Sequence, residues 1–209
     1  MSLYGRIFAA GYDMFMKGTE ESTFGAHRAA LLGGLSGRVV EIGGGTGANL
    51  PYYGPEVTEL AITEPEEPMA RRLERKLSEF SLHARVVRAP AEELPFEDSS
   101  FDYAVSTLVL CTVSDPGRAL AEIRRVLKSD GQLIFMEHVR SEDPKLARWQ
   151  DRLQPLQYRL GHGCHCNRDT LANVKAAGFD VARLEHDKVK KAPPIVRPLI
   201  VGVASLPTR

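Results

Sequence analysis

The sequence predicts an α/β fold built on one doubly wound, mostly parallel β-sheet with helices on both faces. From residue 38 onward, apolar strand-like runs alternate with amphipathic helical segments, the order that produces parallel strands joined by right-handed crossovers. The strand-like runs are nearly continuous in apolar residues, which is typical of strands buried on both faces. The 209 residues contain no internal repeat, low-complexity tract or linker, so they predict a single domain over 1–209.

The first predicted helices precede the sheet. Apolar residues from Leu3 to Phe15 recur at helical spacing, which predicts an amphipathic helix. A second helix is predicted over 21–32, where Gly33 and Gly34 end it. Residues 1–36 are therefore expected to form a helical cap on the rest of the domain.

The sheet and its covering helices follow in chain order. Strands are predicted at 38–42, 57–63, 83–87, 101–107, 131–139, 179–186 and 197–205. Helices are predicted at 66–80, 116–127 and 168–177, and a further helix is expected to start at the glycine turn after the first strand. Residues 145–160 predict an inserted helical segment after the fifth strand, broken at Pro155.

Charge and cysteine content exclude several classes of protein. The 27 Lys and Arg residues balance 27 Asp and Glu, so the basic excess expected of a nucleic-acid-binding protein is absent. The three cysteines cannot form the disulfide framework of a secreted domain, and they favour a cytoplasmic location. The amino terminus lacks the long uncharged core of a signal peptide, and no run approaches the roughly 20 apolar residues of a membrane span.

A glycine turn after the first strand predicts a ligand site. Gly43, Gly45 and Ala48 fit the nicotinamide fingerprint G-x-G-x-x-G/A, and Glu64 follows where a ribose would need an acceptor. Glu41 lies two residues before the first glycine, where its carboxylate would repel a pyrophosphate but attract a cationic ligand. The residues favour the cation and leave a nicotinamide-binding oxidoreductase as the alternative.

The pattern E-x-G-x-G-x-G, from Glu41 to Gly47, resembles motif I of the class I S-adenosylmethionine-dependent methyltransferases. This resemblance implies a Rossmann-like sheet of about seven strands, the last antiparallel, with an N-terminal helical cap and a helical insertion after strand five. It divides the chain into a cofactor-binding core at 37–140, an acceptor-side insertion at 141–178 and the last strands at 179–209. S-adenosylmethionine is the implied cofactor, with a non-catalytic cofactor-binding protein as a further alternative.

The same resemblance implies roles for individual residues around the cofactor. Glu64 is expected to accept hydrogen bonds from the ribose, and the aromatic ring of Tyr12 to help cover the cofactor. Pro90 stands where many family members have an aspartate, so the adenine is expected to rely on the backbone near Ala91 and Glu92. The complete expected cofactor set is Tyr12, Glu41, Gly43, Gly44, Gly45, Gly47, Asn49, Glu64, Pro65, Ala91, Glu92, Thr107 and Leu108.

The stretches 106–113 and 135–139, together with Trp149, Cys164 and Arg168, resemble the methyltransferase-like thiol methyltransferases of animal membranes. This similarity extends over about 38–204. The stretch 47–53 also resembles bacterial phospholipid N-methyltransferases. The expected acceptor is a small lipophilic molecule, with a thiol ahead of a phospholipid amine or a quinone-type carbon. The expected acceptor-side residues are Glu137, His138, Trp149, Cys164, His165 and Arg168.

His138 closes the fifth predicted strand and is the first candidate for a general base, with a structural histidine as the alternative. Glu137 alternates to the opposite face of that strand, where it could instead form an ion pair. The cluster 162–166 lacks the spacing of a zinc site, so no metal is expected. The basic run 188–191 is interpreted as a solvated loop that could touch anionic lipid. A nucleic-acid acceptor is disfavoured because no N/D-P-P-Y/F motif occurs.

Overall fold

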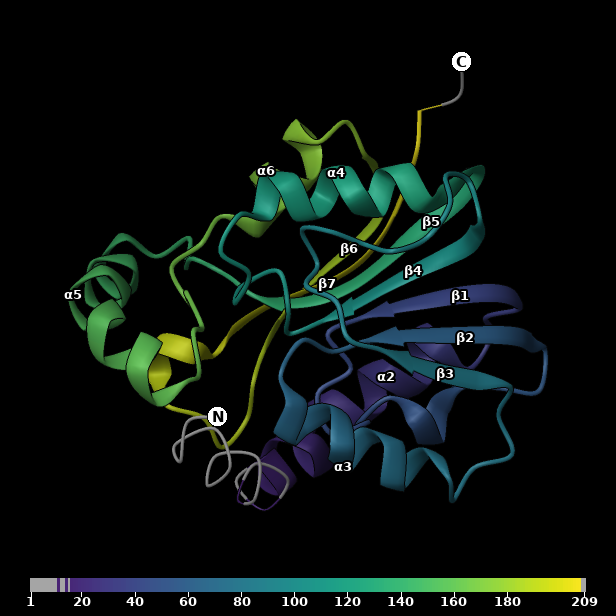
Figure 1. The fold of residues 1–209 in the computed structure, drawn as a ribbon. Helices are drawn as coiled ribbons and strands as arrows, with labels where there is room; N and C mark the ends of the chain where they lie inside the picture. The colour runs from purple at the N-terminus through teal and green to yellow at the C-terminus, as the bar shows by residue number, and fades with distance from the viewer. Residues whose placement is uncertain (1–10, 12–13, 15, 208–209) are drawn as a thin grey trace.

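The computed structural model describes residues 11, 14 and 16–207, and its centre is a seven-stranded sheet with the order β3-β2-β1-β4-β5-β7-β6 (Figure 1). The strands are β1 Gly37–Ile42, β2 Val57–Thr63, β3 Ala84–Val87, β4 Phe101–Thr107, β5 Leu127–His138, β6 Asp180–Lys188 and β7 Pro198–Ser205. Neighbouring strands from β3 to β5 are parallel, whereas β7 is antiparallel to both β5 and β6. The predicted doubly wound sheet with an antiparallel last strand is confirmed.

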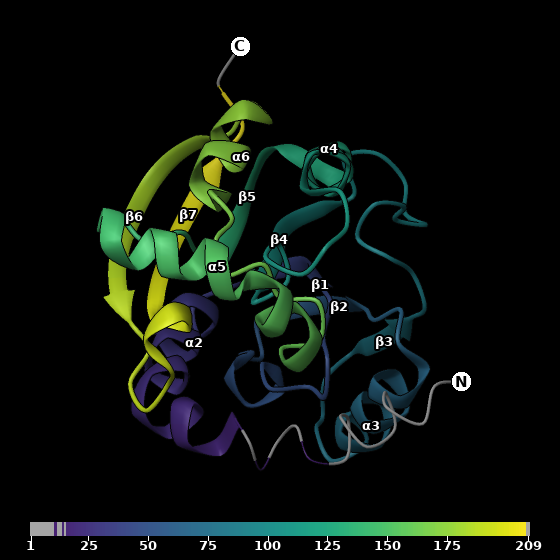
Figure 2. The same ribbon diagram turned by 90° about the vertical axis from the view of Figure 1, so that its left-hand side faces the viewer.

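Helices cover both faces of the sheet, with α2 and α3 on one face and α4 and α6 on the other (Figure 1). The helices are η1 Glu20–Phe24, α2 Gly25–Leu32, η2 Leu50–Tyr52, α3 Glu67–Leu77, α4 Pro116–Val126, α5 Pro144–Leu160, α6 Thr170–Ala176 and η3 Pro194–Val196. In Figure 2, α5 lies in front of the sheet, at the end where the parallel strands terminate.

Alternation along the strands divides the core into two layers. Val39 packs with Leu32 and Leu73 from the α2 and α3 side, whereas Val40 packs with Leu120 from the α4 side. All of these side chains are buried, because consecutive strand residues point to opposite faces of a sheet that is covered twice. Burial on both faces of the sheet therefore explains the near-continuous apolar runs in the sequence.

The glycine turn does not open a helix, contrary to the prediction. Residues 45–49 form turns that lead into η2, a 3₁₀ helix of only three residues, and the chain becomes extended at Tyr53. The side chain of Asn49, at the N-cap position of η2, donates to a buried carboxylate instead of capping the helix. Gly54 follows Tyr53, so no run of helix-forming residues is available to extend η2.

Helix α5 continues through Pro155, although a break was predicted at this residue. Pro155 is exposed, as is Asp151, whose carbonyl group loses its helical donor, so water can replace that donor and the helix need not stop. Asp143 caps the start of α5 by accepting a hydrogen bond from the Lys145 amide at 2.9 Å. Residues 145–160, the predicted inserted segment, therefore lie in one continuous helix.

Other boundaries differ by a few residues. Strand β5 begins at Leu127 rather than 131, because Leu127 already pairs with Phe101 of β4 beyond a register shift. The predicted helix 21–32 is a π-helical turn, η1, continued by α2. The helix predicted over 3–15, and Tyr12 within it, lie outside the described residues apart from positions 11 and 14.

Within the described part of the chain, none of the helices combines the length and the apolar character that a membrane crossing requires.

Candidate active site

The glycine turn lies at the carboxyl ends of β1 and β2 and is fixed by backbone contacts. The Gly44 amide donates to the Thr63 carbonyl at 2.8 Å, and the Gly43 amide donates to the Thr63 hydroxyl at 3.3 Å. The Gly45 amide donates to Oε2 of Glu64 at 2.8 Å. In open α/β sheets this edge is where ligands bind.

The glycines of the turn are required for two different reasons. Gly43, Gly45 and Gly47 have φ of 62°, 56° and 82°, a region that side chains rarely adopt. A Cβ on Gly44 would collide with the side chain of Ile62, so this residue is needed for packing against the sheet. A Cβ on Gly45 would meet nothing within 4 Å. The turn is thus packed against the protein at Gly44 and opens to a ligand at Gly45.

A buried polar network lies beneath the turn and centres on Glu41, at 2% exposure. The Tyr53 hydroxyl donates to one carboxylate oxygen at 2.7 Å, and Nδ2 of Asn49 donates to the other at 3.0 Å. Arg28 donates to Oδ1 of Asn49 and, at 3.0 Å, to Oγ1 of Thr107. The network joins α2, the glycine turn and the end of β4.

The charges of this network are balanced within the protein. Arg28 is 3% exposed and also forms an ion pair with Glu20 at 2.9 Å. Burial raises the pKa of Glu41 to about 7, although its bonds to Tyr53 and Asn49 and the charge of Arg28 act in the opposite direction. Burial and the adjacent Glu41 also raise the pKa of Tyr53 well above its ordinary value. Glu41 is therefore half ionised near neutral pH, and a nearby cation would favour its charged form.

Glu64 follows β2 and lies beside the turn. Its carboxylate accepts from the Gly45 amide and, at 2.9 Å, from the Glu66 amide. Burial raises the pKa of Glu64, while these two backbone donors oppose the shift. Pro65 is exposed immediately beyond it. The structure therefore brings Glu64 and the predicted glycines together.

The β3–β4 loop carries the predicted Ala91 and Glu92. Ala91 is buried, and the Glu92 carboxylate accepts from the Ser114 amide and hydroxyl at 2.9 and 2.8 Å and from the Asp115 amide at 3.2 Å. These contacts outweigh desolvation and lower the pKa of Glu92. The side chain of Glu92 thus joins two loops of the protein.

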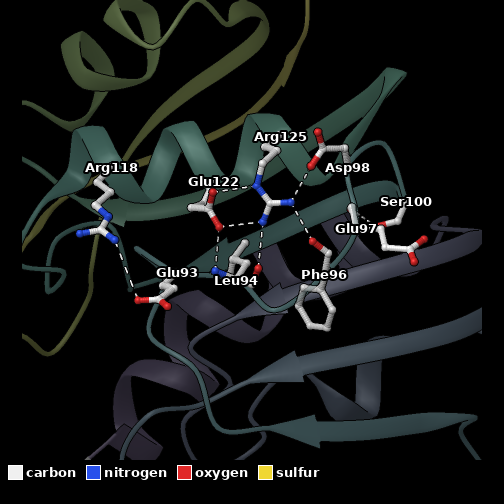
Figure 3. A network of polar contacts seen from close by, with 9 residues as sticks. All are labelled: Glu93, Leu94, Phe96, Glu97, Asp98, Ser100, Arg118, Glu122 and Arg125. Carbon is white, nitrogen blue, oxygen red and sulfur yellow. Dashed lines mark hydrogen bonds and ion pairs between the residues drawn. The ribbon is translucent and has the colours of Figure 1, made fainter.

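Arg125 of α4 holds the rest of the β3–β4 loop (Figure 3). Its guanidinium donates to the carbonyls of Leu94 and Phe96 at 2.8 and 2.7 Å. The same group pairs with Glu122 and Asp98, each at 2.8 Å, and Glu122 accepts from the Leu94 amide. Sequence reasoning missed Arg125, because the loop carbonyls that it binds lie about 30 residues away along the chain.

Two predicted acceptor-side residues, Glu137 and Arg168, instead hold the loop 108–113 after β4. Glu137 is fully buried and accepts from Ser106 Oγ and from the amides of residues 109, 110 and 111 at 2.8–3.2 Å. Arg168 donates to the carbonyls of residues 110 and 113. Both side chains thus bind backbone groups of this loop, and Glu137 forms no ion pair within the part of the chain that the structure describes.

His138, the predicted base, is half-buried and packs edge-on against Phe24, with ring centroids 6.1 Å apart. Its Nδ1 is buried and has no hydrogen-bond partner among the described residues. Burial lowers the pKa of His138 to about 4, because the charged imidazolium is poorly solvated there. A base with this pKa accepts protons weakly at neutral pH.

The cysteine cluster packs as a small apolar unit beside this loop. Cys111, Cys164 and Cys166 are free and buried, and the sulfur atoms of Cys111 and Cys164 are 3.8 Å apart. The His165 amide donates to the Cys111 carbonyl at 2.7 Å, and its ring lies against Tyr158 at 5.1 Å. The cluster therefore borders the loop 108–113.

Trp149 was predicted on the acceptor side but points to solvent, with 54% of its surface exposed. The inward positions of α5 are taken by Ala147 and Gln150. A residue next to Gln150 on a helix is rotated by 100° from it, which turns Trp149 away from the sheet.

Sequence reasoning also missed Arg28 and Tyr53. Arg28 follows Phe24 by four residues and precedes Leu31 by three, so it lies on the buried stripe of its helix. A charged residue on an apolar stripe is a signal that could have identified it. Tyr53 offered no such signal, since it follows a turn of irregular structure.

Comparisons with known proteins agree with this geometry. The family described as "Methyltransferase domain" matches residues 40–135. The chain is 35% identical over 183 residues to the human thiol S-methyltransferase TMT1B, covering 83% of this chain and 73% of that protein. The aligned part of the rat TMT1B is 62% of its length. A phosphatidylethanolamine N-methyltransferase of Cereibacter sphaeroides is 32% identical, over 64% of this chain and 66% of its own.

The fold has solved counterparts as well. The structure of a Thermotoga maritima protein described as a SAM-dependent methyltransferase, possible histamine N-methyltransferase, superposes with a TM-score of 0.70 at 22% identity, covering 97% of this chain and 98% of that one. The residues present fit a cationic, ribose-bearing cofactor, since Glu41 can ionise and Gly45 leaves open space for close approach. The chain belongs to the S-adenosylmethionine-dependent methyltransferases of the Rossmann-like fold.

Proposed function

We propose that this methyltransferase acts on a small lipophilic acceptor, and that the acceptor is an alkyl thiol. The observation that carries the proposal is the 35% identity to the human thiol S-methyltransferase TMT1B over 83% of this chain. Burial also lowers the pKa of His138 to about 4, which makes it a weak base at the predicted position. The loops beside it, 108–113 and 164–166, supply mainly apolar and thiol side chains. An uncharged acceptor that ionises by itself fits this environment.

A thiol has the required chemistry. S-adenosylmethionine would supply a sulfonium methyl group, and the thioether that leaves when this group is transferred needs no proton. A thiol with the pKa of a cysteine side chain, about 8.5, is a few per cent thiolate at neutral pH, and simple alkyl thiols are less ionised. In both, the thiolate is the strongly nucleophilic form. The residues of this chain then have to align the acceptor and exclude water, which rigid loops held by Glu137 and Arg168 can do.

We assign the acceptor side to residues 141–178 and the cofactor side to 37–140, with 1–36 as cap and 179–209 as closing strands. The buried, free state of Cys111, Cys164 and Cys166 supports a reducing compartment, for which we propose the cytoplasm. The similarity to a phosphatidylethanolamine N-methyltransferase supports a phospholipid amine as the second candidate acceptor.

A labelled-methyl transfer screen tests the acceptor. Alkyl thiols, phosphatidylethanolamine vesicles and quinone precursors are supplied in parallel with labelled S-adenosylmethionine. Labelled thioether is the expected product. Methylation of the amine or the quinone precursor alone would replace the proposal, and binding of S-adenosylhomocysteine without any transfer would indicate a cofactor-binding protein that is not an enzyme.

The dependence of the rate on pH should follow the thiol rather than the enzyme. With acceptors of different pKa, the rate at low acceptor concentration should rise about tenfold per pH unit up to the acceptor's own pKa, because only the thiolate reacts. His138→Ala should retain this profile, since a group with a pKa of about 4 does not change charge in this range. If the rate of methyl transfer by the variant no longer rises with pH, His138 is the base.

Two neighbouring glycines should separate cofactor binding from folding. Gly45→Ala places a methyl group in the open space, so the affinity for S-adenosylhomocysteine should fall at least about tenfold, while φ of 56° costs only about 1 kcal/mol of stability. Gly44→Ala collides with Ile62 and should cost about 1–3 kcal/mol of stability. Calorimetric titration and urea unfolding measure the two effects. Equal affinity in Gly45→Ala and wild type would refute this position for the cofactor.

A further inference from the structure

Helix α5 presents an unusual concentration of exposed apolar side chains. Five large hydrophobic residues are exposed in the described part of the chain, and four of them lie on α5. These four are Trp149, Leu156, Tyr158 and Leu160, with exposures of 54%, 56%, 49% and 66%. Exposed apolar residues gathered on one element indicate an interaction surface more than scattered ones do.

Most of them share one face of α5 with basic residues. At 100° per residue, the outward stripe, which we name the α5 outer face, consists of Lys145, Arg148, Trp149, Arg152, Leu156, Arg159 and Leu160. The guanidinium of Arg152 lies over the ring of Trp149, 5.7 Å from its centroid. The acidic residue of α5, Asp151, lies off this stripe and pairs with Arg140. The face is therefore apolar and basic, without an acid.

The outward orientation of this face is fixed by the opposite side of α5. Gln150 is fully buried, with its Nε2 within 2.8–3.0 Å of the carbonyls of Val139, Cys166 and Ile195. Its Oε1 accepts from the Ser141 amide at 2.7 Å. These contacts join α5 to three separate segments, so the helix cannot rotate to bury its apolar residues without breaking them.

We propose that the α5 outer face docks this protein on an anionic lipid bilayer. Tryptophan and leucine side chains on a helix surface can enter the boundary between headgroups and acyl chains, while flanking basic side chains contact lipid phosphates. Because α5 lies at the carboxyl end of the parallel strands (Figure 2), docking would bring the site next to the bilayer. This rests on the proposed function, since a lipophilic acceptor partitions into the membrane.

The charge of the face argues against a second copy of this chain as its occupant. A symmetric dimer through α5 would place the basic residues of this face in one copy against the basic residues of the same face in the other. Like charges brought together in this way are unfavourable, whereas an anionic bilayer complements them. The bilayer therefore suits both the apolar and the charged residues.

Trp149 makes the test direct, because it is the one tryptophan of the chain. Its fluorescence is followed while vesicles of phosphatidylcholine, alone or mixed equally with phosphatidylglycerol, are added to the full chain. The expected result is a blue shift, together with quenching by brominated lipid, with the mixed vesicles only. No shift, or an equal shift with both vesicles, would overturn the proposal.

Variants locate the contact. Vesicle sedimentation of Arg148→Gln/Arg159→Gln should show binding about 25-fold weaker, since each basic residue near an anionic surface contributes about fivefold. Leu156→Ser/Leu160→Ser should weaken it at least about tenfold. The matched control is Arg71→Gln/Arg75→Gln, on exposed positions of α3, and should bind as wild type. Loss of binding in the control but not in the α5 variants would refute the assignment.

Three further outcomes distinguish a failure of the docking proposal from a failure of the proposed function. A blue shift that depends on protein concentration without lipid would indicate a second copy and overturn docking. If the protein methylates soluble thiols but does not bind vesicles, the docking proposal is overturned and the proposed acceptor stands. Vesicle binding without thiol methylation would instead leave docking in place and overturn the acceptor.

Discussion

Replacing Glu137 by alanine should lower the free energy of unfolding by about 4 kcal/mol, the largest loss of stability that we expect from one polar side chain here. The carboxylate is fully buried and accepts from the amides of Val109, Leu110 and Cys111 and from Ser106. Alanine leaves these donors without partners in a place that water does not reach, and it creates a cavity as well.

The effect is expected to reach the loop and not only the core. Leu108, which precedes the three amides, has a φ of 62°, a conformation that is unfavourable for leucine. Such strain persists only while surrounding contacts hold it. Without Glu137, we expect the loop 108–113 to relax, so transfer activity should fall further than the loss of folded protein accounts for.

Glu137→Gln separates the two effects. The amide oxygen can still accept on the side where three donors meet Oε1, but its NH₂ group would then face the Cys111 amide. The expected cost is about 1–2 kcal/mol, between wild type and alanine. Urea unfolding measures the order, and Glu74→Ala at an exposed position of α3 is the control. Equal stability of wild type and Glu137→Ala would contradict the role given to this carboxylate.

The strands could be predicted from the sequence because their signal is local. Val57–Thr63 and Phe101–Thr107 occur at the predicted residues, since apolar runs bounded by polar turns define them without reference to the rest of the chain. The continuity of α5 through Pro155 could not be predicted in this way. It depends on which side of the helix faces water, which the position of Gln150 in the folded protein decides.

The glycines and Glu64 were likewise predictable, because each directly follows a strand whose end can be located from the local sequence. The partners of Glu137 were not, since the amides it accepts from lie 26 to 28 residues earlier in the chain. The contact of Arg28 with Thr107 was even harder to predict, because 79 residues separate the two. Side chains that join distant segments leave little periodic trace in a sequence, and in this protein they determine the shape of the site.

Glu41→Gln should weaken binding of S-adenosylmethionine by about 30-fold, or about 2 kcal/mol, without weakening the fold. Glutamine can accept from Asn49 and can donate to the Tyr53 hydroxyl, so both hydrogen bonds of the buried carboxylate have replacements. What glutamine lacks is the negative charge that complements a cationic cofactor.

The pH dependence of stability gives a second measure of this residue. The pKa of Glu41 rises from 4.5 to about 7 on folding, so between these values the folded state holds a proton that the unfolded state has released. Stability from this group is therefore fully present below pH 4.5, falls as the pH rises, and is lost above pH 7, by about 3 kcal/mol in total. Glu41→Gln should remove that slope and be the more stable protein at pH 8.

Binding of the cofactor should also be coupled to the ionisation of Glu41. A cation binds the ionised form of Glu41, so at pH 7 binding should release about half a proton, and below pH 7 the affinity should fall as the carboxyl becomes protonated. Calorimetric titration in two buffers of different ionisation enthalpy measures the proton, with Glu74→Gln as the matched control. Glu41→Gln should release none. An affinity in that variant equal to wild type would show that the buried carboxylate serves the turn alone, whereas a loss of both affinity and proton release would assign the cofactor's positive charge to Glu41.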